Sequence, residues 1–218
     1  APVDVLQAGQ LSMHFARVEK SKRIDGKSDD DQKSLSLTRI VAVGEPMVID
    51  APSYGVYVET KRLEYDFATR TAKFRARNPF ATSPAVEEQN DNVLMRNAQH
   101  EIIAPSIDFI GGDDSTQWQL VTDGPGQYAG SAEQLNGKKV RATWNKSLSL
   151  QPYEGLQVLR LDGDAIVQSE ELGRIRADLM ELRVRADRTP VATRLDGTVV
   201  YETRYVPQQL ESRAAKGR

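Results

Sequence analysis

Apolar residues alternate with polar ones along most of the chain, and the alternation recurs in three similar segments, 56–65, 100–109 and 173–182. In each segment an apolar residue stands two positions before a small one, and two further apolar residues stand three and five positions after it. The small residues are Thr60, Ala104 and Ala177. Alternation of period two places side chains on one face of a β-strand, and the step of three predicts a bulge or kink that restores the same face.

A second pattern joins two apolar stretches through a glycine. It covers residues 43–49, 161–167 and 195–201, with Gly44, Gly163 and Gly197 near its middle. Glycine permits the backbone conformations that a bend or bulge requires. Two of these patterns come shortly before a repeated segment. Together they predict one structural unit: a strand, a glycine bend, a second strand, a turn and a kinked strand. Units of this kind stack, because one unit alone cannot bury its apolar face.

Turn-forming residues divide the rest of the chain into further expected strands. The expected strands cover residues 11–18, 36–43, 47–50, 55–65, 71–76, 92–96, 99–109, 117–122, 140–150, 156–161, 165–168, 174–184, 191–195 and 198–205. Good helix formers in 170–182 leave a helix open as an alternative there. We expect three parts: an N-terminal strand and charged loop over 1–34, a β region over 35–206, and a polar C-terminal tail over 207–218.

Composition narrows the class of protein. Of 218 residues, 39% are hydrophobic and 28% are charged, which suits a thin core and a sheet with one wet face. Net charge is −2, from 29 basic and 31 acidic residues, so no strong field recruits nucleic acid. The absence of cysteine excludes disulfides, thiolate nucleophiles and thiolate metal sites. The first residues lack the basic and apolar regions of an export signal, so we expect any such signal to be absent from this chain.

Candidate chemistry is sparse. The two histidines, His14 and His100, have no second ligand at metal-binding spacing, and no Gly-x-Ser-x-Gly elbow is present. The acidic pairs 113–114 and 170–171 are candidates by proximity only, and both lie beside turns, where carboxylates are common. We therefore expect no catalytic residue, no metal site and no cofactor, and thus a protein that is not an enzyme.

Two groups of side chains have alternative interpretations. The basic residues on the repeated strands form either the wet face of a sheet or a rim for phosphate groups, and the aromatic residues form either the core or the lining of an apolar groove. The basic group is Lys61, Arg62, Arg174, Arg176, Arg183 and Arg185. The aromatic group is Phe15, Tyr57, Phe74, Trp118, Trp144 and Tyr153.

Residues 175–182 following 161–167, residues 58–69 with their Asp-Phe-Ala-Thr turn, and residues 103–109 share one short pattern. The pattern resembles the OstA-like family of periplasmic lipopolysaccharide-transport proteins, over about residues 35–205. The resemblance implies an all-β fold: a folded-over antiparallel β-jellyroll, with an open, V-shaped sheet of stacked hairpins. It also implies a periplasmic or otherwise exported protein that binds lipopolysaccharide or another acylated lipid. The sheet edges would pair with a protein partner of the same fold, and no nucleic acid is implied.

The leading hypothesis is a non-enzymatic lipid-binding or lipid-bridging protein that holds acyl chains on its apolar inner face. An assembly scaffold with the same fold, a filled core and pairing edges is the alternative, and a carbohydrate-active enzyme is a third class. Under the leading hypothesis the ligand-binding residues are the apolar residues of the three repeats. These are Val58, Leu63, Tyr65, Ile102, Ile107, Phe109, Ile175, Met180 and Leu182.

Overall fold

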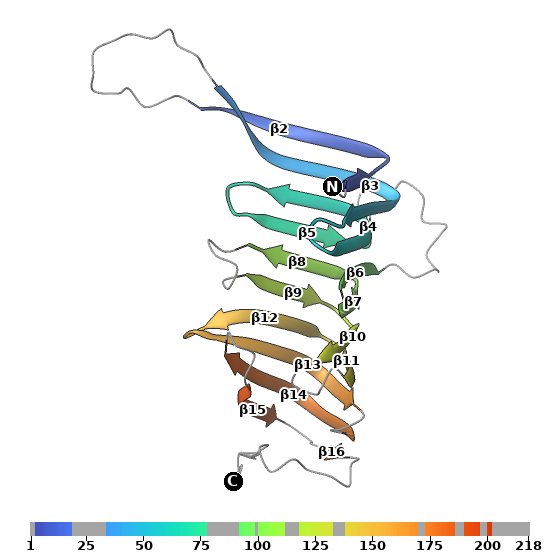
Figure 1. Cartoon of the computed structure of the whole chain (residues 1–218), viewed down its shortest axis with the longest axis vertical. Coiled ribbons are helices and arrows are strands. Elements are labelled where there is room, and N and C mark those ends of the chain that lie inside the picture. Colours follow the sequence, from blue (N-terminus) through green and yellow to red (C-terminus); the bar gives the residue numbers. More distant parts are fainter. Residues whose placement is uncertain are drawn as a thin grey trace, which may run out of the picture.

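The computed structural model describes residues 3–18, 34–77, 92–98, 100–111, 118–132, 138–169, 173–185, 190–196 and 200–201. These residues contain β-strands and no helix, and every strand belongs to one antiparallel sheet (Figure 1). The all-β prediction is therefore confirmed. The strands are β1 (Val5–Gln7), β2 (Gln10–Val18), β3 (Ser34–Ala51), β4 (Val56–Asp66), β5 (Thr71–Arg75), β6 (Val93–Asn97), β7 (His100–Ala104), β8 (Ser106–Ile110), β9 (Gln119–Asp123), β10 (Gly126–Ala132), β11 (Lys138–Trp144), β12 (Ser147–Tyr153), β13 (Leu156–Ser169), β14 (Gly173–Arg185), β15 (Pro190–Asp196) and β16 (Val200–Tyr201).

The sheet is folded into two halves along a bend. The long strand β4 crosses the bend, because it pairs with β5 through residues 62–66 and with β6 through residues 56–59. β13 divides in the same way between β12 and β11. In Figure 1, β6, β7, β10 and β11 lie to the right of the stacked β5, β8, β9 and β12.

We call the two halves half A and half B. Half A contains β2, β5, β8, β9, β12 and β15, with residues 34–43, 62–66, 156–162 and 179–185 of the long strands. Half B contains β1, β6, β7, β10, β11 and β16, with residues 47–51, 56–59, 165–169 and 173–177. One hydrophobic core cluster takes buried side chains from both halves, so the faces that meet inside the fold form a single inner face.

We predicted an explicitly open sheet, but the strand pairings form a closed circuit. Successive pairs run β4–β5–β8–β9–β12–β13 through half A and return β13–β11–β10–β7–β6–β4 through half B, which closes a circuit of ten strands. The reason is that β4 and β13 are long enough to belong to both halves, and so tie the halves together at two places. β1, β2 and β3 extend the sheet beyond β4, and β14, β15 and β16 extend it beyond β13.

The small residue of each repeat marks the bend. Thr60, Ala104 and Ala177 are all buried. The strand registers shift beside Thr60 and Ala177, and Pro105 separates β7 from β8 immediately after Ala104. The predicted kink is therefore present in all three repeats. Small side chains are suited to this position because the two halves come together there and leave little room.

Backbone groups at the bend find partners outside the regular ladder. The Thr60 hydroxyl donates to the carbonyl of Arg75 at 2.8 Å, and the Leu148 N–H donates to Thr122 Oγ1 at 3.0 Å. The Gly124 N–H donates to the carbonyl of Lys146 at 2.7 Å. An unpaired buried polar group costs about 1–3 kcal/mol, so these bonds stabilise the folded sheet.

Several strand boundaries differ from the predicted ones. Residues 99–109 contain two strands, since Pro105 has no N–H for a ladder, and residues 140–150 are divided at Asn145 and Lys146. Conversely, the glycine bends at Gly44 and Gly163 lie within single long strands, β3 and β13. β1 and β10 were not predicted.

The alternative of a helix over 170–182 is wrong, because β14 pairs with β13 along its length. β2 pairs with β3, so the N-terminal strand joins the same sheet. The charged loop 19–33 and the tail 207–218 lie outside the described residues.

The Thr122 hydroxyl gives a direct test of the bend. Replacing Thr122 with Val keeps the side-chain shape but leaves the buried Leu148 N–H without its acceptor. We expect the free energy of unfolding to fall by about 1–3 kcal/mol in a urea titration. Thr122→Ser keeps the oxygen and loses one methyl group, so it should cost less. Equal stability of Thr122→Val and the unchanged protein would show that this bond does not support the bend.

Candidate functional site

The inner face carries continuous rows of side chains that run across the strands. Each member of a row is the register partner of the next, so neighbouring side chains lie side by side. The row of half A nearest the bend, which we call the proximal row, is buried throughout. It consists of Ala42, Leu63, Phe74, Ile107, Thr122, Leu148, Leu161 and Met180.

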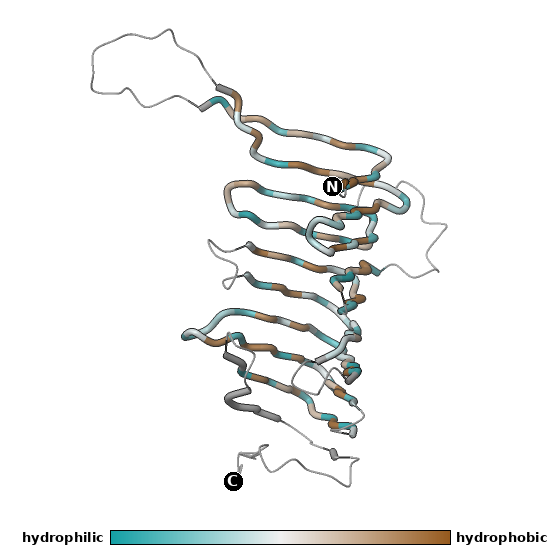
Figure 2. Tube along the Cα trace, viewed as in Figure 1, coloured by the Kyte–Doolittle hydropathy of each residue, from teal (hydrophilic) through white to brown (hydrophobic). Residues whose placement is uncertain are grey.

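A second row lies one step farther from the bend on half A, and we call it the distal row. Two of its members, Ala72 and Leu120, are buried, and the others are half-buried. The distal row consists of Ile40, Tyr65, Ala72, Phe109, Leu120, Leu150, Leu159 and Leu182. Apolar side chains thus become more accessible with distance from the bend. Figure 2 shows the underlying alternation of apolar and polar residues along the strands.

Half B carries a matching apolar row, the half-B row. Val58, Ala142 and Ile175 in it are buried and the remaining members are half-buried. It consists of Ile49, Val58, Met95, Ile102, Tyr128, Ala142, Val167 and Ile175.

The structure brings the nine predicted site residues together in these rows. Each repeat contributes one residue to each row, so equivalent positions of the repeats have equivalent places in the fold. The half-B row receives Val58, Ile102 and Ile175, the proximal row Leu63, Ile107 and Met180, and the distal row Tyr65, Phe109 and Leu182.

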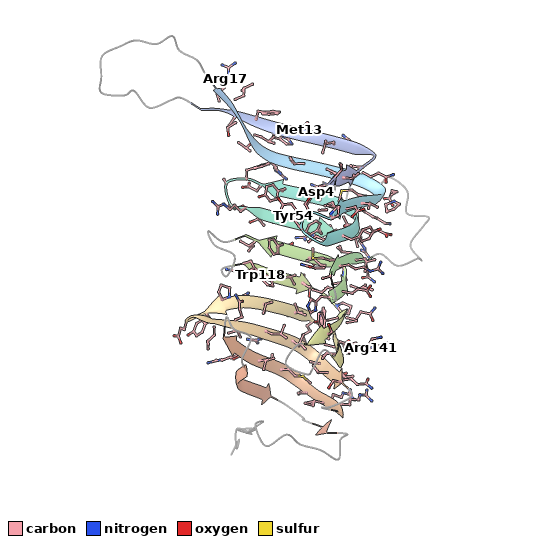
Figure 3. All side chains as sticks on the ribbon, in the orientation of Figure 1. Asp4, Met13, Arg17, Tyr54, Trp118 and Arg141 are labelled. Carbon is pink, nitrogen blue, oxygen red and sulfur yellow. The ribbon has the colours of Figure 1, made fainter. Side chains whose placement is uncertain are left out.

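Aromatic side chains lie near the outer end of half A. Trp118 stacks on Phe109 with ring centroids 5.8 Å apart, and Tyr65 meets Phe67 edge to face at 4.8 Å. Figure 3 shows Trp118 on the left, at the end of half A from which β9 begins. Of the other aromatic candidates, Phe74 and Trp144 are core residues, Tyr57 is half-buried, and Phe15 and Tyr153 are exposed.

The basic residues of the repeats mostly lie on the outer face, opposite the apolar rows. Arg62 binds Glu64, Arg183 binds Glu181 at 2.9 Å, and Arg176 binds Asp164. Lys61, at the bend, lies 3.4 Å from Glu45. Arg174 has a partner as well, and the side chain of Arg185 lies outside the described set. Four of these six cations therefore belong to mixed-charge pairs.

Hydrogen bonds from arginine side chains lower the pKa of two carboxylates on the outer face. For Glu64, partial burial raises the pKa, but hydrogen bonds from Arg39 and Arg62 outweigh it and hold the pKa below the usual value. The hydrogen bond from Arg176 lowers the pKa of Asp164. Both groups are therefore ionised at neutral pH, which is the state that a structural ion pair needs.

A hollow on the outer face is lined by charged groups of both signs, with Arg75 bound to Asp108 inside it. Arg77 and Asp123 line it as well. These charges offset one another, so the hollow offers no field of one sign.

The candidate chemical groups do not assemble into a reaction centre in the part of the chain that the structure describes. Within that part no group of three or more His, Cys, Asp and Glu side chains gathers for a metal ion. His14 lies exposed on the outer face of β2. The acidic pairs 113–114 and 170–171 lie outside the described residues.

His100 lies on the inner face and contacts Tyr128. Its Nδ1 is 2.7 Å from the Tyr128 hydroxyl, and the two rings stack with centroids 5.9 Å apart. The pair lies over Gly130, where an added Cβ would come within 2.3 Å of the Tyr128 oxygen. Burial raises the pKa of Tyr128, so its phenol stays protonated at neutral pH.

Sequence reasoning missed this pair because β10 lacks an apolar alternation. Its inner face reads Gly126, Tyr128 and Gly130, so glycines stand where apolar residues were sought. Trp144 covers Gly126, and its Nε1 donates to the carbonyl of Gly124 at 3.1 Å. The signal that would have found the strand is the pairing of each inward glycine with an aromatic side chain that fills its place.

No protein-family model matches the chain, and no curated protein matches it. The resemblance to the OstA-like family therefore stays a prediction from the repeated segments. The described residues also contain no helix that is long and apolar enough to cross a membrane.

The two inward glycines of β10 should respond differently to an added methyl group. At Gly126 the new Cβ would lie 2.4 Å from the Trp144 ring and 2.9 Å from a backbone oxygen, so Gly126→Ala should lower the free energy of unfolding by about 1–3 kcal/mol. At Gly130 it would meet the Tyr128 hydroxyl and the ring of His100, and His100 is exposed and can move away, so Gly130→Ala should separate His100 from Tyr128 at smaller cost. Urea unfolding checks the first effect and NMR shifts of His100 the second. A larger loss of unfolding free energy in Gly130→Ala than in Gly126→Ala would contradict these contacts.

Proposed function

We propose that the protein is a non-enzymatic lipid-binding or lipid-bridging protein of the exported type, similar in role to lipopolysaccharide-transport components. Acyl chains of lipopolysaccharide or another acylated lipid would lie on the inner face. The proposal requires that the distal row be reachable between the ends of the two halves, as in the V-shaped, open form of the fold that the sequence resemblance implies.

The observation that carries the proposal is the unbroken distal row. Six of its eight members remain only half-buried although all are apolar, whereas the proximal row is already buried. Seven steps between strands, at about 4.8 Å each, give the row a length of about 34 Å. One leaflet of a bilayer core is about 15 Å thick, so two acyl chains end to end would match this length. Each buried CH₂ group would contribute about 0.8 kcal/mol.

Adjacent positions on β12 give a matched test. Leu150 belongs to the distal row, and Ser149 points to the outer face. A carboxylate at Leu150 would oppose an acyl chain, so Leu150→Asp should weaken saturable binding of a fluorescent long-chain lipid at least tenfold. Ser149→Asp adds the same charge on the other face and should leave binding unchanged. Circular dichroism establishes that both variants are folded. Absence of saturable binding to the unchanged protein, or equal loss in both variants, would overturn the proposal.

A second candidate function, an assembly scaffold that pairs through its sheet edges, is favoured by the N-terminal end of the sheet. β2 pairs only with β3 among the described strands, and its inner face carries Leu11, Met13 and Phe15 at 48%, 54% and 55% exposure. An apolar edge strand without protective charge on that stretch is suited to pairing with another strand.

The scaffold hypothesis predicts growth without lipid. Light scattering of the pure protein should increase with concentration as rods form, and Met13→Lys should abolish the increase because it places a charge on the apolar side of the edge. His14→Lys, which adds the charge on the outer face, serves as the control. A constant monomer mass across concentrations would exclude self-assembly and leave lipid binding as the better account.

A further inference from the structure

The inner face of half B changes character one step beyond the half-B row. There Asn97 is the register partner of both Val56 and His100. Farther along, Gly130 pairs with Val140. This outer stretch therefore combines Asn97 and His100 with a glycine and two valines, whereas the distal row of half A is apolar throughout. A molecule that lies along the inner face meets apolar surface on one half and hydrogen-bonding groups at the outer end of the other.

His100 and Asn97 are the exposed polar members of this stretch, and Tyr128 contacts the ring of His100. Tyr128 is half-buried and packs against the hydrophobic core, so its ring is held in place. Its hydroxyl lies 2.7 Å from His100 Nδ1, and the rings are stacked. Gly130 provides the space for both side chains.

The direction of this hydrogen bond depends on which nitrogen of His100 carries the proton. The Tyr128 hydroxyl has one proton to donate, and His100 Nδ1 is its partner in the described part of the molecule. In the arrangement in which Tyr128 donates to Nδ1, a neutral imidazole carries its own proton on Nε2. The neighbouring charged residues Arg96 and Glu101 lie on the outer face and bind each other at 2.7 Å, so neither competes for this nitrogen.

We propose that the His100 Nε2–H donates a hydrogen bond to an anionic phosphate oxygen at the polar end of an acylated lipid whose chain lies on the inner face. Tyr128 is the positioning residue, because it sets which nitrogen of His100 carries the proton. The inference rests on the proposed lipid-binding function and adds to it a preference among lipids. An N–H bond to an anion is stronger than one to a neutral oxygen, so the pair would discriminate phosphorylated from neutral amphiphiles of equal chain length.

The test compares two lipids that share one chain, lauroyl lysophosphatidate and monolauroyl glycerol, below their aggregation concentrations. Titration calorimetry should show that the unchanged protein binds the phosphate lipid about tenfold more tightly. His100→Leu and Tyr128→Phe should each remove most of this preference and leave the affinity for monolauroyl glycerol unchanged. His14→Leu, at the other histidine, should retain the preference.

Nitrogen NMR of the two histidines separates a positioning role from a structural one. In the unchanged protein, His100 should show the Nε2-protonated tautomer, and its Nε2 shift should move on adding lysophosphatidate while His14 stays constant. Tyr128→Phe should lose the fixed tautomer. Equal affinity for both lipids, or an unchanged preference in His100→Leu, would overturn the inference while lipid binding stands. Failure to bind either lipid would overturn both the inference and the proposed function.

Discussion

Backbone groups at the bend must find hydrogen-bond partners inside the protein, and the rest of the structure depends on that constraint. A folded sheet interrupts its own ladders where the strands turn, and water cannot reach the buried groups left there. Thr60 and Thr122 supply hydroxyls at these points, and Pro105 brings no N–H that would need a partner. Once those groups are paired, two half-sheets can lie against each other with one shared core.

The bend also explains how burial varies over the inner face. Close to it the halves are tied by continuous strands, so small and branched residues fill the space and the proximal row is buried. Farther out the same alternation of apolar residues continues into positions that are mostly half-buried. A sheet that needed only a core would have no reason to extend apolar residues so far. Under the proposed function, the distal row is the part of the inner face that a ligand would complete.

Much of this architecture could be predicted from sequence because the inner face follows a simple rule. The three repeats gave the strand class, the kink at Thr60, Ala104 and Ala177, and residues that belong to three shared rows. The rule fails in β10, where glycines at inward positions are covered by Trp144 and by the Tyr128–His100 pair. Closure of the ten-strand circuit was also beyond the sequence pattern, since it depends on which partner each end of β4 and β13 selects.

The central claim is that the distal row is an acyl-chain surface, and site-specific photocrosslinking tests it most directly. A photoreactive phenylalanine analogue placed at Phe109 would report contact on the inner face, and the same analogue at Asp108 would report the outer face of the same strand. The account predicts that a long-chain lipid forms crosslinks from position 109 and not from position 108. Absence of crosslinks at 109, or equal yields at both positions, would contradict it.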